Sequence, residues 1–108
     1  MNSAIDVAPA RDEILVAELH RLGVRHLARL RAIEPGPPLP PVELIAALAA
    51  HPLARLRGAL ILLFLRRPRY NRAVAEALAR LAPHAADTLQ LYYQAAVYLQ
   101  RELSGQLR

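Results

Sequence analysis

The sequence predicts an all-α protein, a compact helical domain of about five or six helices. Leucine and alanine dominate the chain, both residues favour helix, and only four residues are glycine. No stretch alternates apolar and polar residues with the period of two that a half-buried strand requires. Apolar residues recur instead every three or four positions, which is the spacing of an amphipathic helix. At 108 residues the chain has the length of one small domain.

The N-terminal part is expected to be a helical hairpin over residues 10–34, preceded by a flexible tail over residues 1–9. The first helix of this hairpin is predicted for residues 11–22. Gly23 is expected to end it, because glycine readily adopts the left-handed conformation that follows a helix end. The apolar face of the predicted helix consists of Leu15, Leu19 and Leu22.

A second short helix is expected between Val24 and Ile33, where apolar residues continue at helical spacing. The alternative is a single unbroken helix over residues 11–33, in which Gly23 costs about 1 kcal/mol. The proline-rich segment 35–41 cannot be helical in its interior, so it is expected to be an extended connector.

Prolines divide residues 42–108 into four helical segments that alternate between short and long. The predicted segments are 43–50, 53–67, 70–81 and 84–103. The second of them is apolar on every side after Arg57, and such a helix is normally buried at the centre of a fold. The residues of this helix expected in the core are Leu60, Ile61, Leu63 and Phe64.

The predicted helix 70–81 is amphipathic, with one apolar and one charged face. Val74, Leu78 and Leu81 are expected to point into the core. Arg72, Glu76 and Arg80 follow one another four residues apart, so they are expected to line the outside.

Residues 47–65 and 77–99 repeat one pattern: a short amphipathic helix, a turn with a proline, then a longer helix. Within the first copy, HPLARLRGAL resembles the start of the second helix in HEAT and armadillo repeats, with an arginine followed by small residues. The residues that carry the resemblance are Pro52, Leu56, Arg57 and Ala59. The resemblance covers residues 43–103. It implies a pair of stacked helical hairpins, and a function in protein binding and scaffolding without catalysis.

The predicted helix 84–103 has an apolar face wider than one packing contact needs, and three of the four tyrosines lie on it. Tyrosine combines an apolar body with a polar tip, so it suits a protein interface or the half-buried edge of a core. The candidate interface residues are Leu91, Tyr92, Tyr93 and Tyr98. A homo-oligomer or a protein partner is therefore expected, and the alternative is that these tyrosines close the edge of the core.

The positive charge lies in one segment. The formal net charge is +5, all 14 basic side chains are arginine, and residues 44–75 contain six arginines and no acidic residue. Arginine binds phosphate bidentately, so the basic segment Arg55–Arg72 is an alternative site for a nucleic acid or another phosphate ligand. The candidate residues, which surround Tyr70, are Arg66, Arg67, Arg69 and Arg72. A structural role is also open for Arg66 and Arg67, because cations are favoured at the end of a helix.

Several function classes are excluded or disfavoured by composition. The chain has no cysteine and no lysine, so thiolate metal sites, cysteine nucleophiles and lysine-dependent chemistry are impossible. Its four histidines show no metal-ligand spacing, and no enzyme motif is present, so no cofactor, no metal and no catalysis are expected. No apolar run is long enough to cross a membrane, and a cytoplasmic location is expected.

The use of arginine without lysine is typical of a GC-rich bacterial genome, so a bacterial origin is expected. The C-terminal half is also similar to small bacterial helical proteins encoded beside minimal nucleotidyltransferases. That resemblance implies a second alternative, a partner component of a toxin–antitoxin-like nucleotidyltransferase system.

Overall fold

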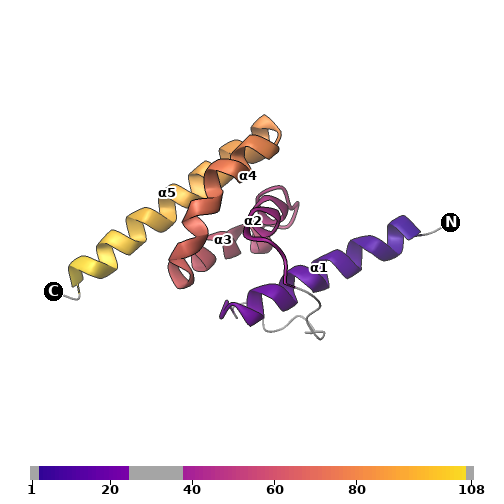
Figure 1. Ribbon diagram of the computed structural model, residues 1–108, viewed down its shortest axis with the longest axis horizontal. Helices are drawn as coiled ribbons and strands as arrows, with labels where there is room; N and C mark the ends of the chain where they lie inside the picture. The colour runs from indigo at the N-terminus through magenta and orange to yellow at the C-terminus, as the bar shows by residue number, and fades with distance from the viewer. Residues whose placement is uncertain (1–2, 25–37, 107–108) are drawn as a thin grey trace.

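A computed structural model describes residues 3–24 and 38–106 of the chain, and it confirms the predicted all-α class. The described residues form five α-helices and one 3₁₀-helix, with no strand among them (Figure 1). The elements are α1 (Ser3–Arg21), α2 (Pro41–Ala49), α3 (Ala54–Arg66), η1 (Pro68–Ala73), α4 (Val74–Arg80) and α5 (Pro83–Gln106).

Helix α1 begins at Ser3, earlier than the predicted start at residue 11, and takes in most of the segment predicted as a tail. Segment 3–10 has no glycine, and its three alanines favour helix, so it extends the helix that follows.

The helix ends at Arg21, as predicted, and Gly23 has the left-handed φ of 95°. The N–H of Val24 donates to the carbonyl of Leu19 at 2.8 Å, and the N–H of Gly23 donates to that of His20 at 3.0 Å, which is the Schellman arrangement. An unbroken helix over residues 11–33 is therefore wrong, and the predicted second helix lies mostly outside the described residues.

Helix α2 begins at Pro41, which was predicted as the last residue of the connector. Proline fits the first position of a helix, because its fixed φ is already helical and its missing N–H has no partner there. Residues 38–40, the described part of the connector before it, are not helical.

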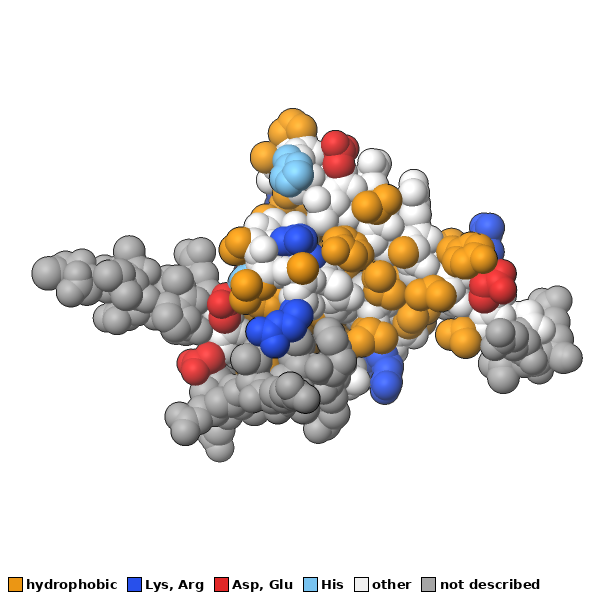
Figure 2. Space-filling view, turned by 180° about the vertical axis from the view of Figure 1, so that it is seen from behind, with side chains coloured by type: hydrophobic (Ala, Val, Ile, Leu, Met, Phe, Trp, Pro, Cys, Tyr) orange, Lys and Arg blue, Asp and Glu red, His pale blue; other side chains and the backbone are white. Residues whose placement is uncertain are grey.

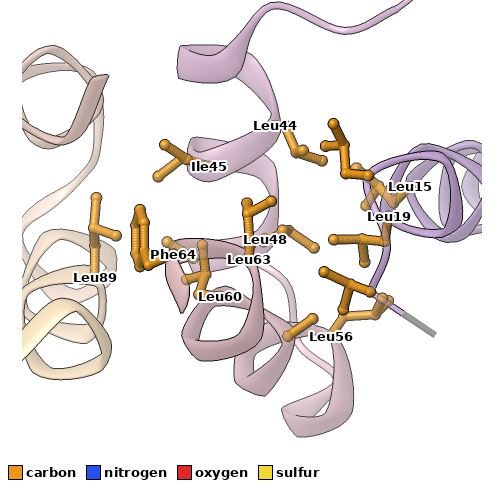
Figure 3. Close-up of a cluster of buried hydrophobic side chains, with 14 of the residues drawn as sticks. Leu15, Leu19, Leu44, Ile45, Leu48, Leu56, Leu60, Leu63, Phe64 and Leu89 are labelled. Carbon is orange, nitrogen blue, oxygen red and sulfur yellow. The ribbon is translucent and has the colours of Figure 1, made fainter. Parts of the chain in front are cut away.

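Helix α3 lies at the centre of the molecule, as predicted, and packs against α2, η1 and α5, while α2 packs against α4. Leu60, Leu63 and Phe64 are buried, and Ile61 is half-buried against the same core. Figure 3 shows Leu15 and Leu19 of α1 facing the α2–α3 pair from one side and Leu89 of α5 facing it from the other. A single leucine-rich core therefore joins α1, α2, α3 and α5.

The predicted helix 70–81 is two elements, the 3₁₀-helix η1 and the α-helix α4. Pro68 starts η1 directly after Arg67, whose backbone (φ −131°, ψ 76°) leaves the helical region and ends α3. The predicted inward and outward faces of this segment are confirmed. Val74 is buried, Leu78 and Leu81 are half-buried against the core, and Arg72, Glu76 and Arg80 are exposed.

In the described part of the chain, no helix combines the length and the apolar character needed to cross a membrane.

Candidate functional site

The exposed face of α5 carries four large apolar side chains between Leu91 and Leu103. The exposed fractions are 66% for Leu91, 63% for Tyr98, 40% for Leu99 and 51% for Leu103. Figure 1 shows α5 extending past the other helices toward the C-terminus, and Figure 2 shows hydrophobic side chains along the face seen from behind and out to that end. These four residues are called the α5 face below.

The structure separates the predicted interface residues into two pairs. Leu91 and Tyr98 belong to the α5 face, whereas Tyr92 and Tyr93 are half-buried and pack against the core. Tyr93 meets Phe64 edge-on, with ring centroids 5.3 Å apart and an interplanar angle of 80°. Tyr92 and Tyr93 thus close the edge of the core, which was the alternative for the tyrosines.

Leu99 and Leu103 belong to the α5 face although they were not among the predicted interface residues. Both lie on the same stripe as the buried Leu89 and Ala96, at positions 89, 96, 99 and 103 of one helix face. The N-terminal half of this stripe is covered by the core. The stripe continues past the core at the C-terminal end of α5, and this leaves Leu99 and Leu103 exposed.

A second candidate site is a pocket of about 430 Å³ where the end of α1, the start of α2 and η1 meet. It is called the basic pocket below. Of the predicted anion-binding residues, Arg67, Arg69 and Arg72 line it, and Arg66 does not. The other lining residues are Arg21, Leu22, Pro41 and Tyr70.

Arg69 and Arg72 line the basic pocket together because η1 is a 3₁₀-helix. Such a helix has three residues per turn, so side chains three residues apart lie in one row. The sequence pattern predicted an α-helix from residue 70, in which Arg69 falls outside the helix. These two side chains share one row because η1 begins at Pro68 and so includes Arg69.

Arg67 connects two elements at the basic pocket. Its Nε donates to the carbonyl oxygen of Leu22 at 3.0 Å, and this carbonyl belongs to the turn that ends α1. Arg67 thus has a structural role. It contacts the turn that ends α1, in addition to its favourable position at the end of its own helix.

Arg21 is in the basic pocket because α1 packs beside η1, a tertiary contact that no local pattern reveals. Its guanidinium holds the carboxylate of Glu18 in two hydrogen bonds, Nε to Oε1 and Nη2 to Oε2. Glu18 is only 3% exposed, so this bidentate pair satisfies a buried charge. The hydrogen bond to Glu18 also raises the pKa of Arg21.

Burial raises the pKa of Tyr70, and the nearby carboxylate of Glu18 raises it further. Arg21, Arg67 and Arg69 act in the opposite direction, but the balance stays above the ordinary value of 10.0. The hydroxyl of Tyr70 is therefore a protonated donor at neutral pH.

A third hollow, of about 440 Å³, lies where the α2–α3 turn meets the start of α5, and its lining includes His51, Arg57, His84 and Leu91. The polar groups of the turn are already used. His51 Nε2 lies 2.7 Å from Asp12 Oδ1, and its Nδ1 accepts from the N–H of Leu53 at 3.0 Å. Arg57 Nη1 donates to the carbonyls of His51 and Pro52, both at 2.8 Å. These side chains stabilise the turn and leave no histidine nitrogen of His51 for a ligand.

Metal ligands do not gather in the described ranges, 3–24 and 38–106, where no group of three or more histidine, aspartate or glutamate side chains could hold an ion. Compared with models of protein families, with curated proteins and with solved structures, the chain matches none of them. The α5 face and the basic pocket are therefore the features from which a function is argued.

Proposed function

We propose that the protein is a non-catalytic helical interaction subunit that binds another protein chain through the α5 face. The observation that carries this proposal is the exposure of three leucines and a tyrosine along one side of a single helix. Leucine and tyrosine that stay exposed on a small domain, in one line rather than scattered, are typical of an interface.

The side chains of the α5 face favour a second copy of the chain as the partner. Leu91, Ala95, Leu99 and Leu103 follow one another every four residues and form one ridge of α5. Consider an antiparallel pair of α5 helices related by a two-fold axis that crosses the ridge midway between Ala95 and Leu99, at the level of residue 97. In this pair Leu91 faces Leu103 of the other copy, and Ala95 faces Leu99. Each end then joins two leucines, and near the axis the small alanine makes room for the leucine opposite.

The test is the mass of the protein in solution, measured by light scattering after size exclusion over a range of concentrations. We expect a concentration-dependent dimer. Leu99→Glu puts a charge near the axis of the pair and is expected to give a monomer with unchanged helix content, because Leu99 contributes little to the core.

Gln90→Glu is the matched control, since Gln90 is exposed on the side of α5 away from the ridge and the variant makes the same change in charge. It is expected to remain a dimer. A wild-type protein that stays monomeric at millimolar concentration contradicts the two-fold pair, and equal behaviour of the two variants contradicts the α5 face as the interface.

The resemblance to HEAT and armadillo repeats is consistent with this proposal and remains a proposal itself. The short helices α2 and α4 pack against each other, and so do the long helices α3 and α5, as in two hairpins stacked in parallel. In such a stack the outer face of the last hairpin has no further repeat to cover it, and the α5 face lies on that hairpin.

A further inference from the structure

The basic pocket has an excess of positive charge that the described residues do not balance. Of its four arginines, Arg21 is neutralised by Glu18. Among the described side chains, those of residues 12–24 and 38–105, Arg67, Arg69 and Arg72 form no ion pair with a carboxylate. Three guanidinium charges around one hollow repel one another, and an anion with more than one negative charge relieves that repulsion.

One donor of the pocket, Arg67, is held in place before any ligand binds. The bond from Arg67 Nε to the Leu22 carbonyl fixes the position of this side chain and leaves the Nη groups of Arg67 for another acceptor. Arg69 and Arg72 lie in one row of η1, and Tyr70 between them adds a hydroxyl that is protonated at neutral pH. Because Arg67 is already anchored, it loses less conformational entropy on binding than a free arginine side chain would.

We propose that the basic pocket binds the phosphate group of a small, nucleotide-sized ligand through Arg67, Arg69 and Arg72. Guanidinium groups match the oxygens of a phosphate in geometry and charge, and three of them suit a phosphate or diphosphate better than a singly charged carboxylate. A volume of about 430 Å³ lies in the range of small-molecule sites. The half-buried ring of Tyr70 offers an apolar wall for the base of a nucleotide.

A small ligand is favoured over a nucleic-acid strand by the distribution of the arginines. A strand needs a line of cations that follows its backbone over several phosphates. Among the described side chains, Arg67, Arg69 and Arg72 converge on one hollow without a carboxylate partner, and the exposed Arg66 is not part of its lining. Arg57 and Arg101 lie at other hollows, so the arginines do not form one continuous line.

The test is calorimetric titration of the full chain with ADP, with pyrophosphate and with adenosine. We expect binding of ADP and pyrophosphate and none of adenosine. Arg69→Ala and Arg72→Ala are each expected to weaken ADP binding about tenfold, because each removes a charge-assisted donor. Tyr70→Phe is expected to weaken it less, since it removes a single neutral donor.

Arg66→Ala is the matched control, because it removes the same charge three residues from Arg69 but outside the pocket. It is expected to change the affinity less than about twofold, and circular dichroism checks that each variant keeps its helix content. If Arg66→Ala and Arg69→Ala weaken ADP binding equally, the affinity comes from the overall positive charge and the proposal is wrong. The proposal is also wrong if adenosine binds as tightly as ADP, because adenosine has no phosphate.

A single-stranded oligonucleotide is the third arm. If ADP does not bind at millimolar concentration, and the oligonucleotide binds with a salt dependence that indicates contacts with several phosphates, the ligand is a strand and the proposal is wrong. The binding of ADP is expected to be unchanged in Leu99→Glu, so this inference and the proposed α5 interface succeed or fail separately.

Discussion

Gly23 and Gly58 show how the same residue type has opposite effects at two positions. Gly23 has a φ of 95° after the end of α1, whereas Gly58 lies inside α3 with no positive φ, and a Cβ at either position meets nothing within 4 Å. The difference between them is therefore one of backbone conformation alone.

Replacing each glycine by alanine is expected to change stability in opposite directions. Gly23→Ala forces an L residue into the left-handed region and should lower the free energy of unfolding by about 1–2 kcal/mol. Gly58→Ala should raise it by about 0.5–1 kcal/mol, because alanine loses less entropy than glycine in a helix. Urea unfolding of the two variants measures both changes, and a stabilised Gly23→Ala variant contradicts the left-handed turn.

Tyr70 makes a small part of the stability depend on pH. Its pKa is raised in the folded protein, first by burial and then by Glu18, above the ordinary value of about 10. The folded state therefore holds the phenolic proton more tightly than the unfolded chain. This contribution is complete below about pH 10 and is lost as the pH rises through the folded pKa.

Tyr70→Phe removes this term, so its free energy of unfolding should fall less steeply than that of the wild type as the pH rises above about 10. The ionisation of tyrosine is followed by ultraviolet absorbance, and Tyr70→Phe should remove signal that titrates above the ordinary pKa of about 10. A variant whose alkaline unfolding curve coincides with that of the wild type contradicts the raised pKa.

The C-terminal end of α1 and the start of α5 could be predicted because their causes are local. The composition of the basic pocket could not be predicted. Gly23 ends α1 through a conformation that belongs to glycine itself, and Pro83 begins α5 through its fixed φ. Arg21 reaches the pocket only because the end of α1 lies beside η1, and Arg69 shares a helix with Arg72 because η1 begins at Pro68, before the helix predicted from residue 70. Helical periodicity contains neither fact.

The same limit applies to α5. Periodicity predicted that its stripe of leucines and tyrosines is apolar, but not which part of the stripe the other helices cover. The core reaches Leu89 and Ala96 and ends before Leu99. As a result, two of the predicted interface residues, Leu91 and Tyr98, are exposed, and the other two, Tyr92 and Tyr93, belong to the edge of the core. Leu99 and Leu103, which the prediction did not name, are exposed as well.

The turn between α2 and α3 is joined to α1 through His51. Its ring bridges Asp12 of α1 and the backbone N–H of Leu53, just before α3. His51→Ala removes both contacts and should lower the free energy of unfolding by about 1–2 kcal/mol. His84→Ala is the comparison, because His84 is exposed, and its loss should cost less than about 0.5 kcal/mol.

Thermal unfolding of both histidine variants and of Asp12→Ala measures this link. Asp12→Ala and His51→Ala remove the same contact, so the double variant should be more stable than the sum of the two single losses predicts. Strict additivity of the two losses contradicts a direct bond between Asp12 and His51.

At the scale of the whole molecule, one core supports two separate surfaces. Helix α3 packs against η1 on the side of the basic pocket and against α5 on the side of the interface. Because the interior is close-packed, both surfaces are presented by the same rigid contacts. Variants at the exposed residues Leu99, Arg69 and Arg72 therefore test binding with little effect on the core.

The two-fold pairing of α5 makes a prediction that no other arrangement shares. Leu91→Glu places a carboxylate opposite Leu103 at both ends of the pair, and Leu103→Lys places an ammonium opposite Leu91, so each variant alone should be a monomer. When the two are mixed, one end joins Glu to Lys and the other joins two leucines, and the mixture should form a heterodimer by light scattering. Leu91→Glu mixed with Leu99→Lys is the control, because both variants alone should be monomers and the lysine lies opposite Ala95 rather than opposite the new glutamate. If heterodimers form equally well in both mixtures, opposite charges attract without a fixed register. If the mixture of Leu91→Glu and Leu103→Lys stays monomeric, the axis at the level of residue 97 is wrong.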